Sequence, residues 1–206
     1  MATSPQRLPV ILLAVGLAVL VWSGVAPFDR TTWLLEVLPA LIALPILVWT
    51  RRSFPLTPLA YWLILIHAVI LMVGGRYTYE HVPAGDWVKE MLGLSRNPYD
   101  RLGHLAQGFI PAIIAREILL RRGPLSEGGW LFFLVTCICL AISAAYELIE
   151  WGVAVAMGTG ADAFLGTQGD VWDTQWDMFC ALLGSLAAQL TIAPWHSRQL
   201  ARFAGR

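Results

Sequence analysis

The chain has 206 residues, of which 57% are hydrophobic and only 14% are charged. This composition lies outside the usual range of soluble globular domains and predicts a membrane protein. The formal net charge is zero, which argues against a nucleic-acid partner and against a polybasic lipid-binding surface.

Apolar runs recur along the chain, and several reach the ~20 residues that a helix needs to cross a bilayer. We expect an all-α fold, a polytopic membrane helical bundle with about six transmembrane helices. One domain should cover residues 1–206. The predicted spans are residues 8–28, 31–50, 53–75, 102–120, 128–152 and 177–197.

The first apolar run also resembles a secretory signal, because Arg7 precedes it and small residues end it. The apolar core of a signal peptide is usually about 7 to 15 residues long. Since this run is longer, we expect it to remain in the protein as the first helix.

A polar segment separates the third and fourth predicted spans. Within it, "GDWVKEMLGLS" predicts a helix over about residues 86–95, with Asp86 as the N-cap. Its apolar residues share a face opposite its charged residues: Trp87, Val88, Met91 and Leu92 against Lys89, Glu90 and Arg96. This amphipathic pattern predicts a short helix that lies in the membrane interface.

Arginines follow an alternating pattern along the chain, and short cytoplasmic loops are enriched in them. The connections expected in the cytoplasm carry Arg7, Arg51, Arg52, Arg121, Arg122, Arg198, Arg202 and Arg206, whereas the segment 158–177 has no Lys or Arg. The pattern predicts a multi-pass protein of the bacterial inner (plasma) membrane with both termini in the cytoplasm. Near that side, Arg116, Glu117 and Arg121 predict an ion-pair network.

This threading brings polar residues from three predicted spans to the outer end of the bundle. The fourth span begins there with His104, and the fifth span ends there with Glu147 and Glu150. The sixth span begins there, preceded by the acidic stretch "GDVWDTQWDM". That stretch contributes Asp170, Asp173 and Asp177 to the same layer.

Ionisable side chains at membrane depth are energetically unfavourable without partners. Arg101 can supply one positive charge to these groups. The segment 158–177 contains no Lys or Arg that could supply a second one. The remaining negative charge favours either a bound divalent cation or carboxyl groups that keep their protons. The candidate metal ligands are His104, Glu147, Glu150, Asp170, Asp173 and Asp177.

The spacings E-x-x-E and D-x-x-D-x-x-x-D place carboxylates on adjacent turns of two helices, as in metal sites of helix bundles. Oxygen ligands suit magnesium, calcium or manganese, and a mixed set with one imidazole also accepts zinc or iron. The candidate catalytic groups are His104, Glu147 and Asp177. Catalysis is left open, because no nucleophile or phosphate-cradling motif accompanies them.

Each candidate also has a structural alternative. Asp173 suits the N-cap of the last span, and Asp170 and Asp177 suit a favourable interaction with its helix dipole. Glu147 and Glu150 suit a solvated helix end, and His104 suits a hydrogen bond between helices. The three alternatives would have to hold together in one layer, which favours a shared site.

We expect this pocket to bind a divalent cation and to bind or act on a lipid or envelope-precursor head group. One alternative is a proton-coupled small-molecule transporter, for which membrane carboxylates are common. A further alternative is a non-catalytic protein that binds an envelope precursor or an antibiotic. The expected surroundings are the lipid bilayer, and the pattern specifies no oligomeric state.

Four segments carry a resemblance to a known family: "RYTYEHVPAGDWV", "NPYDRLGHLAQGF", "AAYELIEW" and "GDVWDTQWDM". They resemble the YjdF-like family of bacterial inner-membrane proteins, of uncharacterised function, and the resemblance implies a small multi-span helical protein. A more distant likeness is to the VanZ-like family, linked with glycopeptide resistance. The corresponding positions are Asp100, His104, Glu150, Asp173 and Asp177, although that family commonly has Asn at the last one and its following glycine falls earlier than Gly184.

Overall fold

The computed structural model describes residues 7–157 and 165–204. These residues form helices and no strands, as the sequence predicts. The helices are α1 (Leu8–Gly24), α2 (Arg30–Thr50), α3 (Pro58–Tyr77), α4 (Pro83–Leu92), α5 (Tyr99–Arg122), α6 (Gly129–Met157), α8 (Asp173–Thr191) and α9 (Ala193–Ala204).

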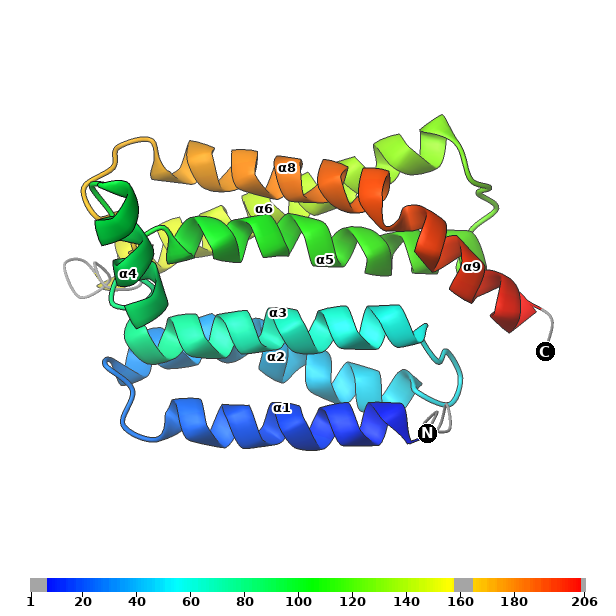
Figure 1. Cartoon of the computed structure of the whole chain (residues 1–206), viewed down its shortest axis with the longest axis horizontal. Coiled ribbons are helices and arrows are strands. Elements are labelled where there is room, and N and C mark those ends of the chain that lie inside the picture. Colours follow the sequence, from blue (N-terminus) through cyan, green and yellow to red (C-terminus); the bar gives the residue numbers. More distant parts are fainter. Residues whose placement is uncertain (1–6, 158–164, 205–206) are drawn as a thin grey trace.

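The long helices run side by side in two groups of three (Figure 1). In one group α1 and α2 both pack on α3, and in the other α5, α6 and α8 pack on one another. Contact between α3 and α5 joins the groups. The short helix α4 lies at one end of the bundle, here named the α4 end, and α9 lies at the other, the α9 end (Figure 1). Helix α1 begins and α9 ends at this α9 end.

Local capping explains where two of the apolar helices begin. The side chain of Asp29 accepts a hydrogen bond of 2.7 Å from the backbone N–H of Thr32 at the start of α2. That backbone hydrogen bond holds the pKa of Asp29 below its ordinary value. Thr57 caps α3 in the same way, through the N–H of Ala60, and Pro58 occupies the first helical position. The third helix therefore begins five residues later than the predicted span at residue 53.

A helix is present near the predicted residues 86–95, but its N-cap differs from the predicted one, and its position in the membrane interface remains a prediction. Helix α4 begins at Pro83 after Val82, and Asp86 lies in its first turn. Proline at the first helical position needs no hydrogen-bonded N–H, so the helix can begin there without a side-chain cap. Trp87, with 64% of its surface exposed, and Met91, with 59%, leave the apolar face of α4 uncovered.

The last predicted span, residues 177–197, corresponds to two helices. Helix α8 begins earlier, at Asp173, and ends at Thr191, and α9 then leaves at an angle of 61°. Pro194 explains the break, because proline lacks an N–H and disfavours a helical residue before it. Helix α9 consequently folds across the α9 end of the bundle (Figure 1).

Glycine allows α5 and α8 to make the most extensive helix contact of the bundle. A Cβ atom on Gly108 would overlap the backbone carbonyl of Ala181, and one on Gly184 would overlap that of Leu105. Small residues permit this close approach of helix backbones inside membranes. The contact aligns the first turns of α5 and α8, which carry the polar residues described below.

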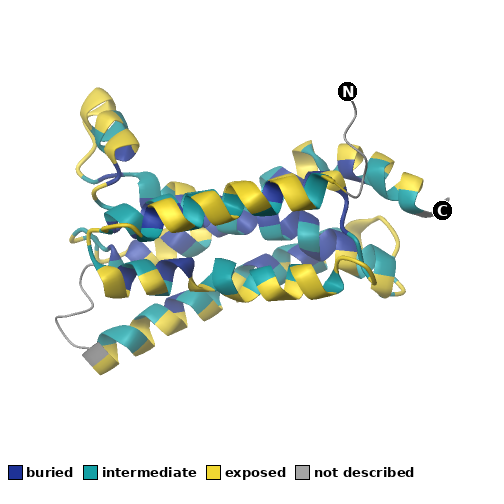
Figure 2. Cartoon of the chain, turned by 90° about the horizontal axis from the view of Figure 1, so that it is seen from below, coloured by how far each residue is buried: buried dark blue, intermediate teal, exposed yellow. Residues whose placement is uncertain are grey.

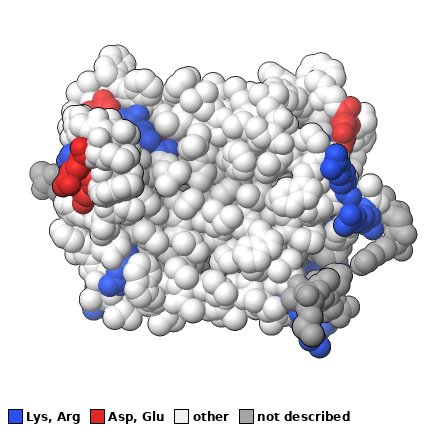
Figure 3. Space-filling model, in the orientation of Figure 1, with Lys and Arg blue, Asp and Glu red and all other residues white. Residues whose placement is uncertain are grey.

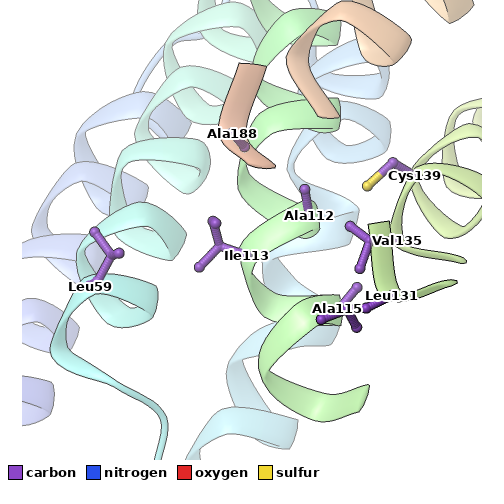
Figure 4. Close-up of a cluster of buried hydrophobic side chains, with 8 residues drawn as sticks. All are labelled: Leu59, Ala112, Ile113, Ala115, Leu131, Val135, Cys139 and Ala188. Atoms are coloured by element: carbon purple, nitrogen blue, oxygen red, sulfur yellow. The ribbon is translucent and has the colours of Figure 1, made fainter. Parts of the chain in front are cut away.

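An apolar core fills the bundle between its two ends. Figure 4 shows its side chains converging from α3, α5, α6 and α8, with Ile113 and Val135 fully buried. The cluster consists of Leu59, Ala112, Ile113, Ala115, Leu131, Val135, Cys139 and Ala188. Cys139 is a free cysteine that packs within this cluster.

The surface has the character of a membrane protein. Exposed residues follow the outer faces of the long helices (Figure 2). In α2, only 17% of its 18-residue apolar segment is buried inside the protein. Many of these exposed residues are large and apolar. Figure 3 shows charged side chains at the two ends of the bundle and a broad uncharged band between them. Lipid is the solvent that fits such a band.

Within residues 7–157 and 165–204, three helices, α2, α3 and α6, are long and apolar enough to cross a membrane, and the bent pair α8 and α9 makes up to four. Helix α1 is apolar but has only 17 residues. Helix α5 has 24 residues and carries buried charges near both ends. The structure therefore contains a helix at each predicted range, and the crossing of all six remains a prediction.

Candidate functional site

A cluster of ionisable side chains lies at the α4 end of the bundle. Helix α5 contributes Asp100 and His104, α6 contributes Glu147, and α8 contributes Asp173 and Asp177. All five residues are buried, with between 2% and 8% of their surface exposed. The predicted convergence of three helices on one polar layer is thus what the structure contains.

His104 lies at the centre of this cluster. Its Nε2 is 3.5 Å from Asp100 Oδ1 and 3.9 Å from Asp177 Oδ2, and its Nδ1 is 3.8 Å from Glu147 Oε1. One potential ligand atom from each of Asp100, His104 and Asp177 lies within 4.8 Å of the other two. We name these three residues the Asp–His–Asp group. Asp100 and His104 are one helical turn apart, so both point to the same face of α5.

Two carboxylate oxygens in the cluster lack hydrogen bonds. Glu147 Oε1 and Asp177 Oδ1 are buried and have no hydrogen-bond partner among the described residues. Buried acceptors are rarely left unpaired, because desolvation then goes uncompensated. A proton or a bound cation at either oxygen would compensate for this desolvation.

Arginines form ion pairs with the aspartates of the cluster, and these include a longer contact of 3.6 Å between Arg101 Nε and Asp177 Oδ1. Arg96 forms an ion pair with Asp173 and lies 2.9 Å from Asp100. Arg101 lies 2.9 Å from Asp170 and 3.3 Å from Asp173. From the sequence, Arg101 was expected to be the available cation, and Arg96 was expected on the polar face of the helix predicted over residues 86–95. Arg96 instead lies beyond the end of α4 and supplies the second cation.

Arg96 and Asn97, which lie between α4 and α5, hold residues 166–168 in place before α8. Arg96 donates hydrogen bonds to the carbonyl oxygens of Gly166, at 3.2 Å, and Thr167, at 3.3 Å. The amide of Gln168 bonds Asn97 in both directions, at 2.9 and 3.2 Å. These contacts fix the approach to α8 and hence the positions of its aspartates.

Two groups outside the membrane helices have shifted pKa values that agree with this ion pairing. Burial alone would lower the pKa of Arg96, but its hydrogen bond to Asp173 and the neighbouring aspartates raise it. The pKa of Asp170 is lowered, first by the hydrogen bond from the backbone N–H of Trp172 and then by Arg101. Both groups therefore stay charged at neutral pH.

A small cavity lies beside the Asp–His–Asp group. Its volume is about 20 Å³, enough for one water molecule or a single ion. The lining residues include Glu36, Tyr79, Asp100, His104, Gln107, Tyr146 and Glu150. Tyr146 donates a hydrogen bond of 3.1 Å to Glu36, which joins α6 to α2.

The structural alternatives for single residues fare differently. Asp173 is not the N-cap of α8, since Trp172 occupies that position and no side chain caps the helix. Glu147 is not a solvated end, because α6 continues to Met157 and only 7% of Glu147 is exposed. The hydrogen bond that His104 makes is within α5, at 3.3 Å from Gln107.

The structure divides the predicted metal ligands into two sets. His104, Glu147 and Asp177 face one another, and Asp100 joins them. Asp170 and Asp173 instead bind the arginines, and Glu150 lines the cavity.

Sequence reasoning missed Arg96 and Glu36 as members of this site. Arg96 lies four residues before Asp100, a spacing typical of an ion pair on one helix face. Glu36 is the one acidic residue of the apolar run 31–50. An acidic residue in such a run is itself a signal for a buried polar site.

A second polar network lies at the α9 end. Glu117 is fully buried and accepts hydrogen bonds from Thr57, from Arg121 at 2.6 Å and from His196 at 3.0 Å. Arg116 in turn contacts His196 at 3.0 Å. The predicted network of Arg116, Glu117 and Arg121 is confirmed, with His196 as an added member that ties α9 to α5.

Comparison with known proteins agrees with this architecture. The family of predicted membrane proteins named DUF2238 matches residues 8–198. The chain belongs to this family. The inner membrane protein YjdF of Escherichia coli (strain K12) is 58% identical to it over 185 residues, which are 90% of this chain and 88% of the relative. No solved structure matches the chain.

Membership in the DUF2238 family confirms the predicted resemblance to YjdF-like proteins and the membrane character of the chain. The match from residue 8 to residue 198 includes every residue of the Asp–His–Asp group. It also includes Arg96 and Arg101 and the aspartates with which they form ion pairs. The more distant likeness to the VanZ-like family remains a prediction.

Proposed function

We propose that this DUF2238 protein binds one divalent cation in the Asp–His–Asp group and uses it to bind or act on a lipid or envelope-precursor head group. One observation carries the proposal: Asp100, His104 and Asp177 each offer a ligand atom, all within 4.8 Å of one another. A metal ion at their centre would draw the three atoms closer together to reach bond lengths of about 2.0–2.2 Å.

The charge balance of the cluster supports a cation. Arg96 and Arg101 pair with Asp100, Asp170 and Asp173. Arg101 Nε also lies 3.6 Å from Asp177 Oδ1. Glu147 Oε1 and Asp177 Oδ1 are nevertheless buried oxygens without a hydrogen-bond partner among the described residues. A divalent cation would satisfy both by direct or water-mediated bonds, with Glu147 as a fourth ligand.

The ligand set indicates which cations fit. Two or three carboxylates with one imidazole suit Mn²⁺, Fe²⁺ or Zn²⁺ better than Ca²⁺, which prefers six to eight oxygen ligands. A ligating imidazole usually has its other nitrogen held by a hydrogen bond. Gln107 holds Nδ1 of His104 in this way, at 3.3 Å, and leaves Nε2 facing Asp100 and Asp177.

The place of the site favours a head group as the bound molecule. The cluster lies at one end of the bundle, next to the interfacial helix α4 and away from the uncharged band (Figure 3). An apolar core separates it from the network around Glu117 (Figure 4). This arrangement supports chemistry at one membrane face over a proton path through the bundle, because a transporter needs a polar route between both faces.

The distribution of arginines supports an orientation with the site at the outer face of the inner membrane. The connections at the α9 end carry Arg51, Arg52, Arg121 and Arg122, and such enrichment marks the cytoplasmic side. Single cysteines in a variant without native cysteines test this: Ser53→Cys should resist an impermeant reagent in intact cells, and Ser95→Cys should react. The reverse labelling would contradict the orientation.

Titration calorimetry with chelator-treated protein tests the metal site. We expect wild type to bind one Mn²⁺ or Zn²⁺ per chain and Asp177→Asn to bind at least about tenfold more weakly. Glu90→Gln is the matched control, because Glu90 is an exposed acidic residue of α4 outside the cluster. Equal binding by wild type and Asp177→Asn would overturn the proposal.

A further inference from the structure

An apolar groove lies between α1, α2 and α3, in the part of the bundle nearer the α9 end. Its volume is about 560 Å³, a size typical of small-molecule sites. The lining extends from Pro9 to Leu20 on α1, from Pro39 to Arg51 on α2 and from Tyr61 to Met72 on α3. Its side toward α5 and α6 is closed by Ile110, Pro111, Ile114 and Ile142.

Direct contacts between the same helices close the groove toward the α4 end. The indole N–H of Trp33 on α2 donates a hydrogen bond of 3.0 Å to Ser23 Oγ on α1. The backbone of α3 also lies close against α2, because a Cβ atom on Gly75 would be 3.0 Å from the Cβ of Glu36. On each helix the groove lining begins on the α9 side of these contacts. On α2 it begins at Pro39, and a proline inside a helix favours a bend that works against continuous packing.

At the α9 end the groove is open to the surroundings. Val10 on α1 and Val48 on α2 both line it and are 51% and 45% exposed. Arg51, at the end of the lining on α2, is exposed as well. We name this end, between Val10, Val48 and Arg51, the mouth of the groove.

Arg51 supplies a positive charge at the mouth that no acidic side chain of residues 7–157 and 165–204 balances in an ion pair. Other arginines near this end are paired, Arg121 with Glu117 at 2.6 Å and Arg116 with Glu127 at 2.7 Å. A guanidinium forms strong charge-assisted hydrogen bonds to phosphate. The mouth therefore suits the anionic phosphate of a lipid.

The length of the groove corresponds to one leaflet of a bilayer. At about 1.5 Å per residue, the lining spans about 16 Å on α1 and α3 and about 18 Å on α2. One leaflet contributes about half of the ~30 Å hydrocarbon core. A lipid chain that begins beside Arg51 would therefore end near the bilayer centre, at the closed end of the groove.

We infer that the groove binds one acyl chain of a phospholipid from the leaflet at the α9 end, and that Arg51 binds the phosphate of this lipid. Apart from Arg51, Tyr61 and His67, the residues that line the groove are apolar, as an acyl chain requires. The inference goes beyond the proposed function and does not depend on a metal ion, because the Asp–His–Asp group lies toward the opposite end of the bundle.

Native mass spectrometry of the full chain in detergent tests the role of Arg51. The probes are phosphatidylglycerol and a diacylglycerol with the same chains but no phosphate. We expect Arg51→Gln to weaken phosphatidylglycerol binding about tenfold and to leave diacylglycerol binding unchanged. Arg30→Gln is the matched control, because Arg30 is an exposed arginine at the other end of α2. Equal phosphatidylglycerol binding by the two variants would overturn the assignment of the phosphate to Arg51.

Two groove variants test the place of the acyl chain. Ala43→Trp on α2 and Ala68→Trp on α3 each fill part of the groove, because both alanines line it. Each should weaken the binding of both probes at least about tenfold. Ile46→Trp should bind the probes as wild type does, since Ile46 is 52% exposed and lies outside the lining. Undiminished binding by both groove variants, or a wild type that binds no phosphatidylglycerol, would overturn the inference.

Discussion

Arg96 binds the carboxylate of Asp173, although 77 positions separate the two residues in the chain. The same guanidinium lies 2.9 Å from Asp100 at the start of α5. One arginine beyond the end of α4 thus connects the first turns of α5 and α8. This connection sets the position of Asp100, one of the proposed metal ligands, relative to the helix that carries Asp177.

Removal of Arg96 should destabilise the protein strongly. Arg96→Ala would leave Asp173 and Asp100 buried with less positive charge, and breaking a buried pair costs about 3–5 kcal/mol. Thermal unfolding in detergent measures the effect. Arg30→Ala is the control, because Arg30 is exposed at the start of α2. A similar small change in both variants would show that the Arg96 ion pair contributes little.

The contact between α5 and α8 should tolerate no side chain at Gly184. A Cβ atom there would overlap the backbone of Leu105. We expect Gly184→Ala to lower the free energy of unfolding by about 1–3 kcal/mol or more. Gly152→Ala in α6 should be neutral or stabilising, because nothing lies within 4 Å of its Cβ position. Equal effects in unfolding experiments would show that the helices can separate freely at Gly184.

Loss of His196 should release α9 from the bundle. His196→Ala removes a buried partner of Glu117, which is fully buried, and an unmatched buried group costs about 1–3 kcal/mol. We expect trypsin to cut faster at Arg198 and Arg202 in this variant, since α9 would leave its docked position more often. Unchanged cleavage would contradict a role for His196 in holding α9.

The cap of α2 should contribute a pH-dependent part of the stability. The folded state lowers the pKa of Asp29, so its stabilisation is present above the unfolded pKa and is lost as the pH falls through the folded pKa. Asp29→Ala should cost about 1 kcal/mol near neutral pH. The difference in melting temperature from wild type should shrink below about pH 4. A constant difference across that range would contradict the assignment of the effect to the Asp29 carboxylate.

The apolar runs were sufficient to place the long helices, because each long helix presents apolar side chains along most of its length. It also brought His104, Glu147 and Asp177 to one layer, since alternating directions of the helices place their ends together. Helix ends were less predictable. The start of α4 at Pro83 and the break after Thr191 depend on single prolines in polar or mixed contexts.

The partners of the polar residues could not be predicted from spacing alone. Arg96 lies outside every predicted span. It contacts Gly166 and Asp173 only because the segment before α8 folds back against it. Glu36 reaches the site through Tyr146, from a helix in the other group of three. The apolar groove was equally hidden, because its lining has the same periodicity as a packed helix face.

The most direct test of the proposed metal site is anomalous X-ray scattering from crystals grown with Mn²⁺ or Zn²⁺. The proposal predicts one anomalous peak at about 2.0–2.3 Å from an oxygen of Asp100, Nε2 of His104 and an oxygen of Asp177. That peak should disappear in Asp177→Asn crystals of the same form. Absence of a peak at this position in wild-type crystals, with His104 bonded directly to a carboxylate, would contradict the account.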